Sequence, residues 1–180
     1  MTETAQTVLT FWREAGRDKW FERDETFDAS IRARFAQLQR AAALGELDDW
    51  QATPQGALAL IILLDQFPRN LHRGSPLAFA TDAKARAIAC EALARGFDRQ
   101  VEDDLRLFLY MPLGHSEDLA DQDRCIPLIE ALGWREATGS AREHRDIIAR
   151  FGRFPHRNAA LGRAATEEEQ RFLDEGGFSG

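Results

Sequence analysis

The chain has 180 residues, 44% of them hydrophobic and 29% charged, and a formal net charge of −7 at pH 7. This composition fits one globular domain over residues 1–180 with enough apolar side chains for a core. The acidic balance argues against binding to nucleic acid or to an anionic membrane. The longest apolar run, Ala57–Leu64, is too short to cross a bilayer, and no signal-peptide pattern opens the sequence, so we expect a cytoplasmic protein.

No segment alternates apolar and polar residues as a half-buried strand does, which predicts an all-α fold. A first short helix is expected over residues 7–14. Asp28 can cap a second helix that continues to about Leu44 and ends at Gly45. Thr53, followed by a proline, starts a third helix that is apolar all round, so other helices must surround it and it becomes the central element.

The second half of the chain continues this helical pattern to a total of about eight helices. Ser75-Pro76 and Asp82 precede a helix that runs through Ala94 and is ended by Gly96, and residues 105–111 form a short buried turn or helix. The remaining helices are expected to cover residues 117–132 after a Ser116 cap, to run from Ser140 to Phe151, and to begin at Thr166 with a capping box.

One phrase occurs twice, as Leu-Asp-Gln-Phe-Pro-Arg-Asn at residues 64–70 and as Phe-Gly-Arg-Phe-Pro-His-Arg-Asn at residues 151–158. In each copy we expect an apolar helix to stop at Phe-Pro and to present Arg and Asn just beyond its end. Functional residues often lie on segments that rigid elements hold in place. Both copies are therefore candidate parts of a functional site.

Asp65 follows eight apolar residues, so its carboxylate is expected to be buried and to need a cation. Arg69, four residues later, can supply that cation if the helix continues, but Pro68 is expected to end it. An arginine of the second copy is the alternative. Such an ion pair either ties two helix ends together or positions an arginine for a ligand.

The region around the second copy is basic, because residues 142–163 carry six arginines against Glu143 and Asp146. Arg150 and Arg153 are about one turn apart and suit a carboxylate or a phosphate, which paired guanidinium groups bind bidentately. His144 shares a helix face with apolar residues, so it is either a hydrogen-bonded core residue or part of a cleft.

His115 and His144 are the candidate catalytic residues, as general acids or bases. No HxxxH or HExxH spacing is present, so we expect no metal, and we expect no cofactor. The candidate ligand-binding residues combine the two copies with the acidic residue next to Ser116, and they are Asp65, Arg69, Asn70, Glu117, Arg150, Arg153, His156, Arg157 and Asn158.

Several phrases, taken in order along almost the whole chain, resemble the bacterial domain of unknown function 924 family. They include Val-Leu-Thr-Phe-Trp at residues 8–12, both copies of the Phe-Pro phrase, and Leu-Gly-His-Ser-Glu-Asp at residues 113–118. This chain has Gly114 where the family motif usually has a glutamate. The resemblance implies an all-helical bundle of antiparallel helix pairs, like the tetratricopeptide-repeat superfamily, without a settled activity.

Three functional hypotheses follow. The first is a binding protein whose Arg- and His-lined cleft holds an anionic small molecule or an acidic peptide. The second is a small hydrolase or transferase that uses His115 or His144 as acid and base. The third is a helical scaffold for partner proteins, which would need an exposed apolar groove.

Overall fold

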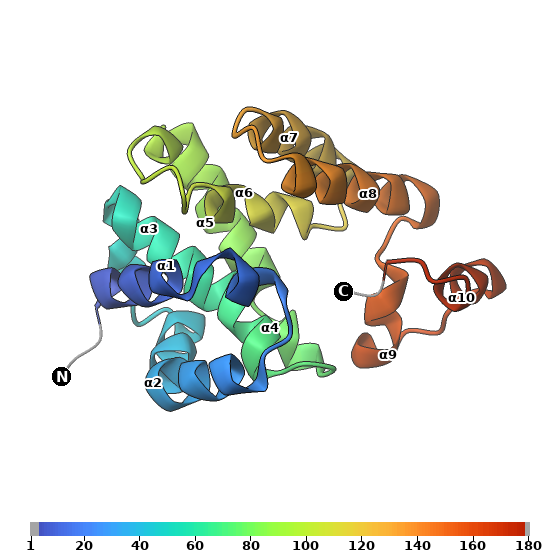
Figure 1. Cartoon of the computed structure of the whole chain (residues 1–180), viewed down its shortest axis with the longest axis horizontal. Coiled ribbons are helices and arrows are strands. Elements are labelled where there is room, and N and C mark those ends of the chain that lie inside the picture. Colours follow the sequence, from blue (N-terminus) through green and yellow to red (C-terminus); the bar gives the residue numbers. More distant parts are fainter. Residues whose placement is uncertain (1–3, 179–180) are drawn as a thin grey trace. The chain divides into compact units, whose positions relative to one another are not determined.

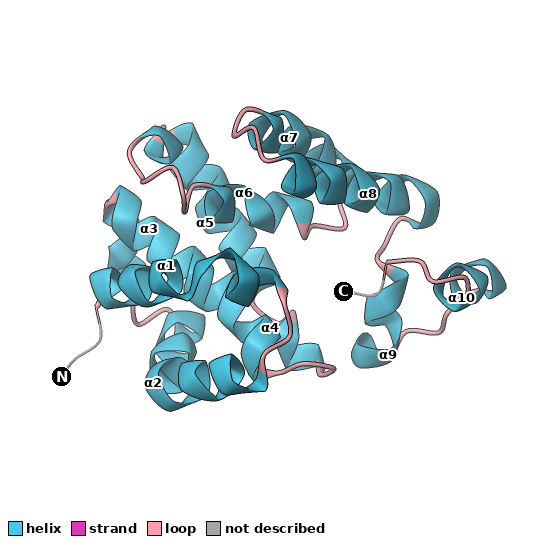
Figure 2. Ribbon diagram, viewed as in Figure 1, coloured by secondary structure: helices cyan, strands magenta, loops and turns pink. Residues whose placement is uncertain are grey.

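The computed structural model describes residues 4–178, and every regular element in this range is helical, without a strand (Figure 2). The all-α prediction is confirmed. The chain packs into two compact units. Unit 1 comprises the residues up to Arg73 together with Leu77–Pro112, and unit 2 comprises Gly74–Pro76 and the residues from Leu113 onward. The expectation of one domain over residues 1–180 stays a prediction.

Both units consist of α-helices joined by connections, several of which contain a short 3-10 helix (Figure 1). Unit 1 contains α1 (Ala5–Phe21), α2 (Glu25–Leu44), α3 (Pro54–Ile61), α4 (Phe67–Leu71), α5 (Asp82–Ala94) and most of α6 (Leu107–Gly114). Unit 2 contains α7 (Leu119–Glu130), α8 (Arg135–Phe151), α9 (Asn158–Leu161) and α10 (Glu167–Asp174). A short turn joins α7 to α8, and the two helices pack against each other (Figure 1).

Local sequence signals place several helix ends correctly. The Thr53 hydroxyl accepts a hydrogen bond from the Gly56 N–H at 3.1 Å, next to a proline in the first turn of α3. Gly45 ends α2 in the left-handed conformation, with φ of 88°. Thr166 and Glu169 form the expected capping box at the start of α10.

Other predicted helix starts are wrong because a neighbouring residue takes the cap. Asp24 caps α2 by accepting from the Phe27 N–H at 2.9 Å, while Asp28 lies inside the helix and is buried. Asp118 caps α7 in place of Ser116, by accepting from the Ala120 N–H at 2.9 Å. Two further helices are longer than expected, since α8 begins at Arg135 and α1 continues through a kink at Gly16 to Phe21.

The apolar helix is the centre of unit 1, as predicted. Each side chain from Ala57 to Leu64 is at most 1% exposed, and α3 packs against α1 and α5. An aromatic cluster covers this core from α1, with Trp12 stacked on Trp20 at a centroid distance of 6.2 Å and edge-on to Phe108 at 5.4 Å. The rings of Trp12 and Trp20 therefore cover the core, while Phe21 is exposed.

The prediction that Pro68 ends the central helix is wrong. After α3 the backbone makes one π-helical turn, Ile62–Gln66, in which the Phe67 N–H bonds to the Ile62 carbonyl, and α4 then continues to Leu71. Proline has no N–H for the carbonyl four residues earlier, which here belongs to Leu64. The Thr81 hydroxyl donates to that carbonyl at 2.5 Å, so a side chain replaces the missing backbone donor.

Replacing Thr81 with valine should therefore lower the free energy of unfolding by about 1–2 kcal/mol, because it leaves the buried Leu64 carbonyl without this donor. Urea unfolding followed by circular dichroism measures the loss. Thr81→Ser keeps a hydroxyl and is the control. Equal stability of the valine variant and the parent would mean that Leu64 does not depend on this hydrogen bond.

Candidate functional site

The first copy of the repeated phrase places a buried ion-pair network inside unit 1. Asp65 is fully buried, and its Oδ1 lies 3.3 Å from Nη1 of Arg69. Arg69 also binds both carboxylate oxygens of Asp82, at 2.9 and 3.0 Å, and donates to the Asp65 carbonyl at 2.5 Å. Burial alone would lower the pKa of Arg69, but the two carboxylates outweigh it and raise that pKa above its ordinary value.

Asn70 contacts a carboxylate that the sequence pattern does not reveal. Its amide donates to Asp28 at 2.7 Å, and Arg73 binds the two oxygens of the same carboxylate at 2.6 and 3.0 Å. Burial by itself would raise the pKa of Asp28. The hydrogen bonds from Arg73 and Asn70 outweigh this effect, so the pKa lies below its ordinary value. This contact joins α2 to the end of α4.

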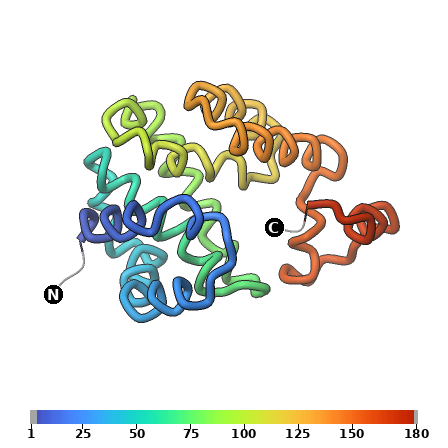
Figure 3. The backbone as a smooth tube through the Cα atoms, viewed as in Figure 1, coloured from blue at the N-terminus to red at the C-terminus, as the bar shows by residue number. Residues whose placement is uncertain are grey.

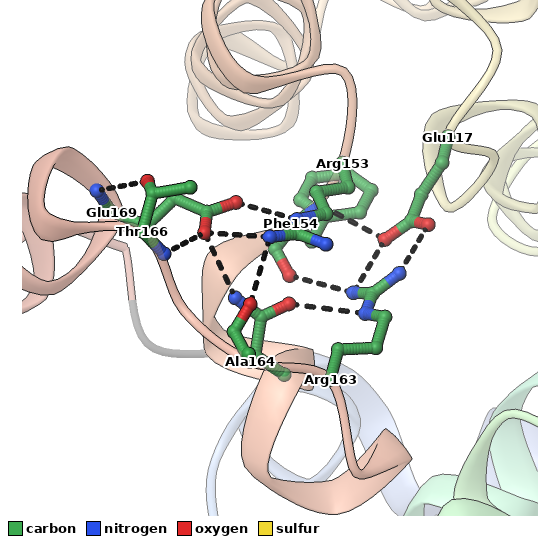
Figure 4. Close-up of polar contacts among 8 residues, drawn as sticks. Glu117, Arg153, Phe154, Arg163, Ala164, Thr166 and Glu169 are labelled. Carbon is green, nitrogen blue, oxygen red and sulfur yellow. Dashed lines mark hydrogen bonds and ion pairs between the residues drawn. The ribbon is translucent and has the colours of Figure 1, made fainter.

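In unit 2, Arg153 binds Glu169, the acidic member of the capping box of α10 (Figure 4). Its guanidinium contacts both carboxylate oxygens of Glu169, at 2.5 and 2.8 Å, and donates to the Ala164 carbonyl at 3.0 Å. Glu169 is 2% exposed and also accepts from the Thr166 N–H at 2.7 Å. The bond from Arg153 is the main reason that the pKa of Glu169 falls to about 2.

Glu117 forms the second polar contact of this region (Figure 4). Its carboxylate accepts two bonds from Arg163, at 2.7 and 3.0 Å, and one from the Phe154 N–H at 2.9 Å. Burial would raise the pKa of Glu117, but these bonds lower it below its ordinary value. Asn158 lies between the two contacts, because it donates to Glu169 at 3.3 Å and accepts from Arg163 at 3.0 Å.

Arg150 does not act together with Arg153, although the two are close in sequence. Its Nε donates to Glu168 at 2.9 Å, and this pair is largely exposed, at 54% and 58% of the two side chains. The guanidinium lies over the ring of Phe151 at 4.6 Å from the centroid. Each of the two arginines thus binds its own carboxylate on α10.

Three of the four histidines of the chain belong to one set of ring contacts in unit 2, and we call His115, His144 and His156 the histidine group. His144 and His156 lie against Phe154 and Phe178, and His115 lies next to His144. His144 lies edge-on to Phe154 at 5.3 Å and to Phe178 at 4.6 Å between centroids. His156 lies 5.5 Å from Phe154 and 5.0 Å from Phe178, and the His115 and His144 rings are 6.4 Å apart. The guanidinium of Arg157, which is 6% exposed, lies 4.5 Å from the Phe154 centroid.

One backbone carbonyl orients the central histidine of this group. Nδ1 of His144 lies 3.1 Å from the Gly114 oxygen, which also accepts from the buried amide of Gln122 at 2.8 Å. A carbonyl can only accept, so Nδ1 must carry the proton, and Nε2 is the basic nitrogen of the neutral ring. Gly114 also packs close to Cys125, whose burial raises the pKa of the thiol to about 12 and makes it unreactive.

The predicted ligand-binding residues thus form separate contacts within each unit. Asp65, Arg69 and Asn70 belong to unit 1, and the others belong to unit 2. Their partners Asp28, Asp82, Arg163 and Glu169 are not among the predicted site residues. The capping-box pattern identifies Glu169 as a constrained carboxylate and could have indicated it; the other three carry no local signal.

Within residues 4–178, no three His, Cys, Asp or Glu side chains come together in a way that could hold a metal ion. None of the helices in this range combines the length and the apolar character that a membrane crossing requires.

The fold and these contacts define an all-helical protein whose second unit combines a histidine group with ion pairs to a C-terminal helix. The chain belongs to the family described as bacterial protein of unknown function (DUF924), whose family model matches residues 8–177. It is similar to the solved structure of a protein of unknown function, ATU0120, from Agrobacterium tumefaciens. The two sequences are 49% identical, the match covers 96% of this chain and 97% of that one, and the TM-score is 0.91. The comparison with curated proteins finds no match.

Proposed function

We propose that the protein binds an anionic small molecule through the histidine group and Arg157 of unit 2. The supporting observation is that two imidazoles and a buried guanidinium lie against Phe154, with a third imidazole next to His144, in a chain whose net charge is −7. Protonated imidazole and guanidinium are the donors that a phosphate or a carboxylate group needs. Arg69, Arg150 and Arg153 bind carboxylates of the protein itself, so we do not assign them to the ligand.

Thermal-shift measurements with inorganic phosphate, citrate and an acidic peptide test this proposal. An anion present at about a hundred times its dissociation constant stabilises the folded protein by about 2.7 kcal/mol, which is measurable. A protonated imidazole binds an anion more strongly than a neutral one, so the shift is measured at pH 6 and at pH 8 to detect the contribution of the histidines. An acidic peptide that stabilises while phosphate and citrate do not would make a peptide the ligand instead.

The matched controls use the histidine outside the group. His144→Ala and His156→Ala should reduce the shift, whereas His72→Ala, in unit 1, should leave it unchanged. The proposal fails if no anion produces a shift at either pH. It also fails if the shift is the same in the His144→Ala and His156→Ala variants as in the parent.

A second candidate function is hydrolysis or group transfer with His144 or His115 as acid and base. The observation that favours it is the hydrogen bond to the Gly114 carbonyl, which holds the His144 proton on Nδ1 and makes Nε2 the basic nitrogen. A panel of nitrophenyl esters and phosphate esters, measured against pH, tests it. If the pH dependence of the rate keeps its histidine-like limb in the His144→Ala variant, His144 is not the acid or base of the reaction. The scaffold hypothesis stays a prediction.

A further inference from the structure

After α10 the chain folds back within unit 2 (Figure 3). Its residue Phe178 lies against His144 and His156. After α10 the chain turns at Gly176, which has φ of 82° and whose N–H bonds to the Leu173 carbonyl at 3.1 Å. The next N–H, of Gly177, bonds to the Phe172 carbonyl at 2.9 Å. This pair of bonds reverses the chain direction at a helix end and requires a residue that tolerates positive φ.

Gly177 is required for a different reason. A β-carbon at this position would lie 2.5–2.6 Å from three ring carbons of Phe172, closer than atoms can pack. Glycine therefore allows the backbone to lie directly against the Phe172 ring. Two successive glycines with different roles fix the path of the residue that follows them.

That residue is Phe178, whose ring lies edge-on to His144 at 4.6 Å and to His156 at 5.0 Å between centroids. It also packs against the apolar cluster of Ile147, Ile148 and Phe154. His144 comes from α8 and His156 from the turn before α9, so a single side chain lies against both imidazoles. An aromatic ring at this distance excludes water and solutes from the ring face that it contacts.

We propose that Gly176–Phe178 is a displaceable cover over His144 and His156, and that an anion gains access to these two rings when Phe178 moves away. The identity of the ligand, an anion, rests on the proposed function. The covering of the two histidines by Phe178 is independent of it. Displacement requires a change of backbone dihedral angles at the glycine turn, where glycine tolerates more conformations than any other residue, and the loss of the Phe178 contacts with Ile147, Ile148 and Phe154. Because only the open form binds the anion, the apparent affinity of the protein for the anion is lower than the intrinsic affinity of the open form.

Chemical modification tests the covering without a ligand. Diethyl pyrocarbonate acylates accessible neutral imidazoles, and mass spectrometry gives the rate for each histidine in the full chain. In Phe178→Ala the rates at His144 and His156 should rise at least about threefold, while the rate at His72 stays unchanged as the internal control. Leu161→Ala, which trims another half-exposed apolar residue of unit 2, should change none of the rates.

A second variant moves the cover without removing the ring. In Gly177→Ala the new β-carbon overlaps the Phe172 ring, so either this ring or the segment must shift. A shift of the segment should raise both rates as in Phe178→Ala. Circular dichroism checks that each variant keeps its helices. Unchanged rates at His144 and His156 in both variants would overturn the proposal.

Titration with inorganic phosphate separates the cover from the proposed function. If both hold, phosphate binds Phe178→Ala several-fold more tightly than it binds the parent. If phosphate, and likewise citrate, binds neither protein while the modification rates rise, the proposed binding of an anionic small molecule fails and the covering of the histidines stands. If phosphate binds both equally, Phe178 does not control access, and the proposal fails.

Discussion

Replacing Arg69 with methionine is expected to lower the free energy of unfolding by about 3–5 kcal/mol, the typical loss when one partner of a buried ion pair is removed. The reason is that Asp65 is fully buried and Asp82 is mostly buried, and both carboxylates depend on this guanidinium. The Asp65 carbonyl also loses the hydrogen bond from Nη1. Urea unfolding followed by circular dichroism measures the change.

Two further variants show where this loss comes from. Arg142→Met removes an arginine whose pair with Glu130 is more than a third exposed on both sides, so it should change the stability by no more than about 0.5 kcal/mol. Adding Asp65→Asn to Arg69→Met should recover part of the loss, because it removes the uncompensated charge. If Arg69→Met were as mild as Arg142→Met, Asp65 would not depend on Arg69.

Replacing Glu169 with glutamine should lower the free energy of unfolding by about 3 kcal/mol and weaken the attachment of α10. The reason is that Arg153, Asn158 and the Thr166 N–H all donate to this buried carboxylate. Hydrogen exchange read by mass spectrometry should show faster exchange over residues 158–174. Glu168→Gln, one residue away, breaks only the exposed pair with Arg150 and is the matched control. Equal exchange in the two variants would contradict a special role for Glu169.

The same carboxylate makes the stability of unit 2 depend on pH. Its pKa is about 2 in the folded protein and 4.5 ordinarily, so its contribution is fully present above about pH 4.5 and is lost as the pH falls towards 2. The difference in stability between the parent and Glu169→Gln should therefore shrink over this range. A difference that stays constant from pH 6 to pH 2 would mean that the ion pair does not lower the pKa of Glu169.

The contacts that α10 makes give the second copy of the repeated phrase a structural role. Arg153 binds Glu169, and Arg163 binds Glu117 (Figure 4). Asn158 contacts both Glu169 and Arg163. The first copy has a comparable role in unit 1, where Arg69 and Asn70 connect its helix to Asp82 and to Asp28. The similar residues of the two copies therefore make ion-pair contacts of the same kind within separate units.

The sequence alone determined the helical class, the central apolar helix and those helix ends whose signals lie within one turn. Thr53, Gly45 and Thr166 belong to this set, because a cap and the N–H or carbonyl groups that it satisfies are at most a few residues apart. Where two capping residues compete, as with Asp24 and Asp28, the local pattern does not decide. Asp28 lies inside the helix because Asn70 and Arg73 bind its carboxylate there.

Only the tertiary structure decided which acidic side chain pairs with which basic side chain. Asp65 and Arg69 are four residues apart and were one of two pairings open to the sequence, but Arg153 and Glu169 are separated by 16 residues and Glu117 and Arg163 by 46. With 23 basic and 30 acidic side chains, composition permits far more pairings than the fold can make. The gathering of His115, His144 and His156 has the same origin, because packing brings together residues that no local hydrogen bond or helical spacing connects.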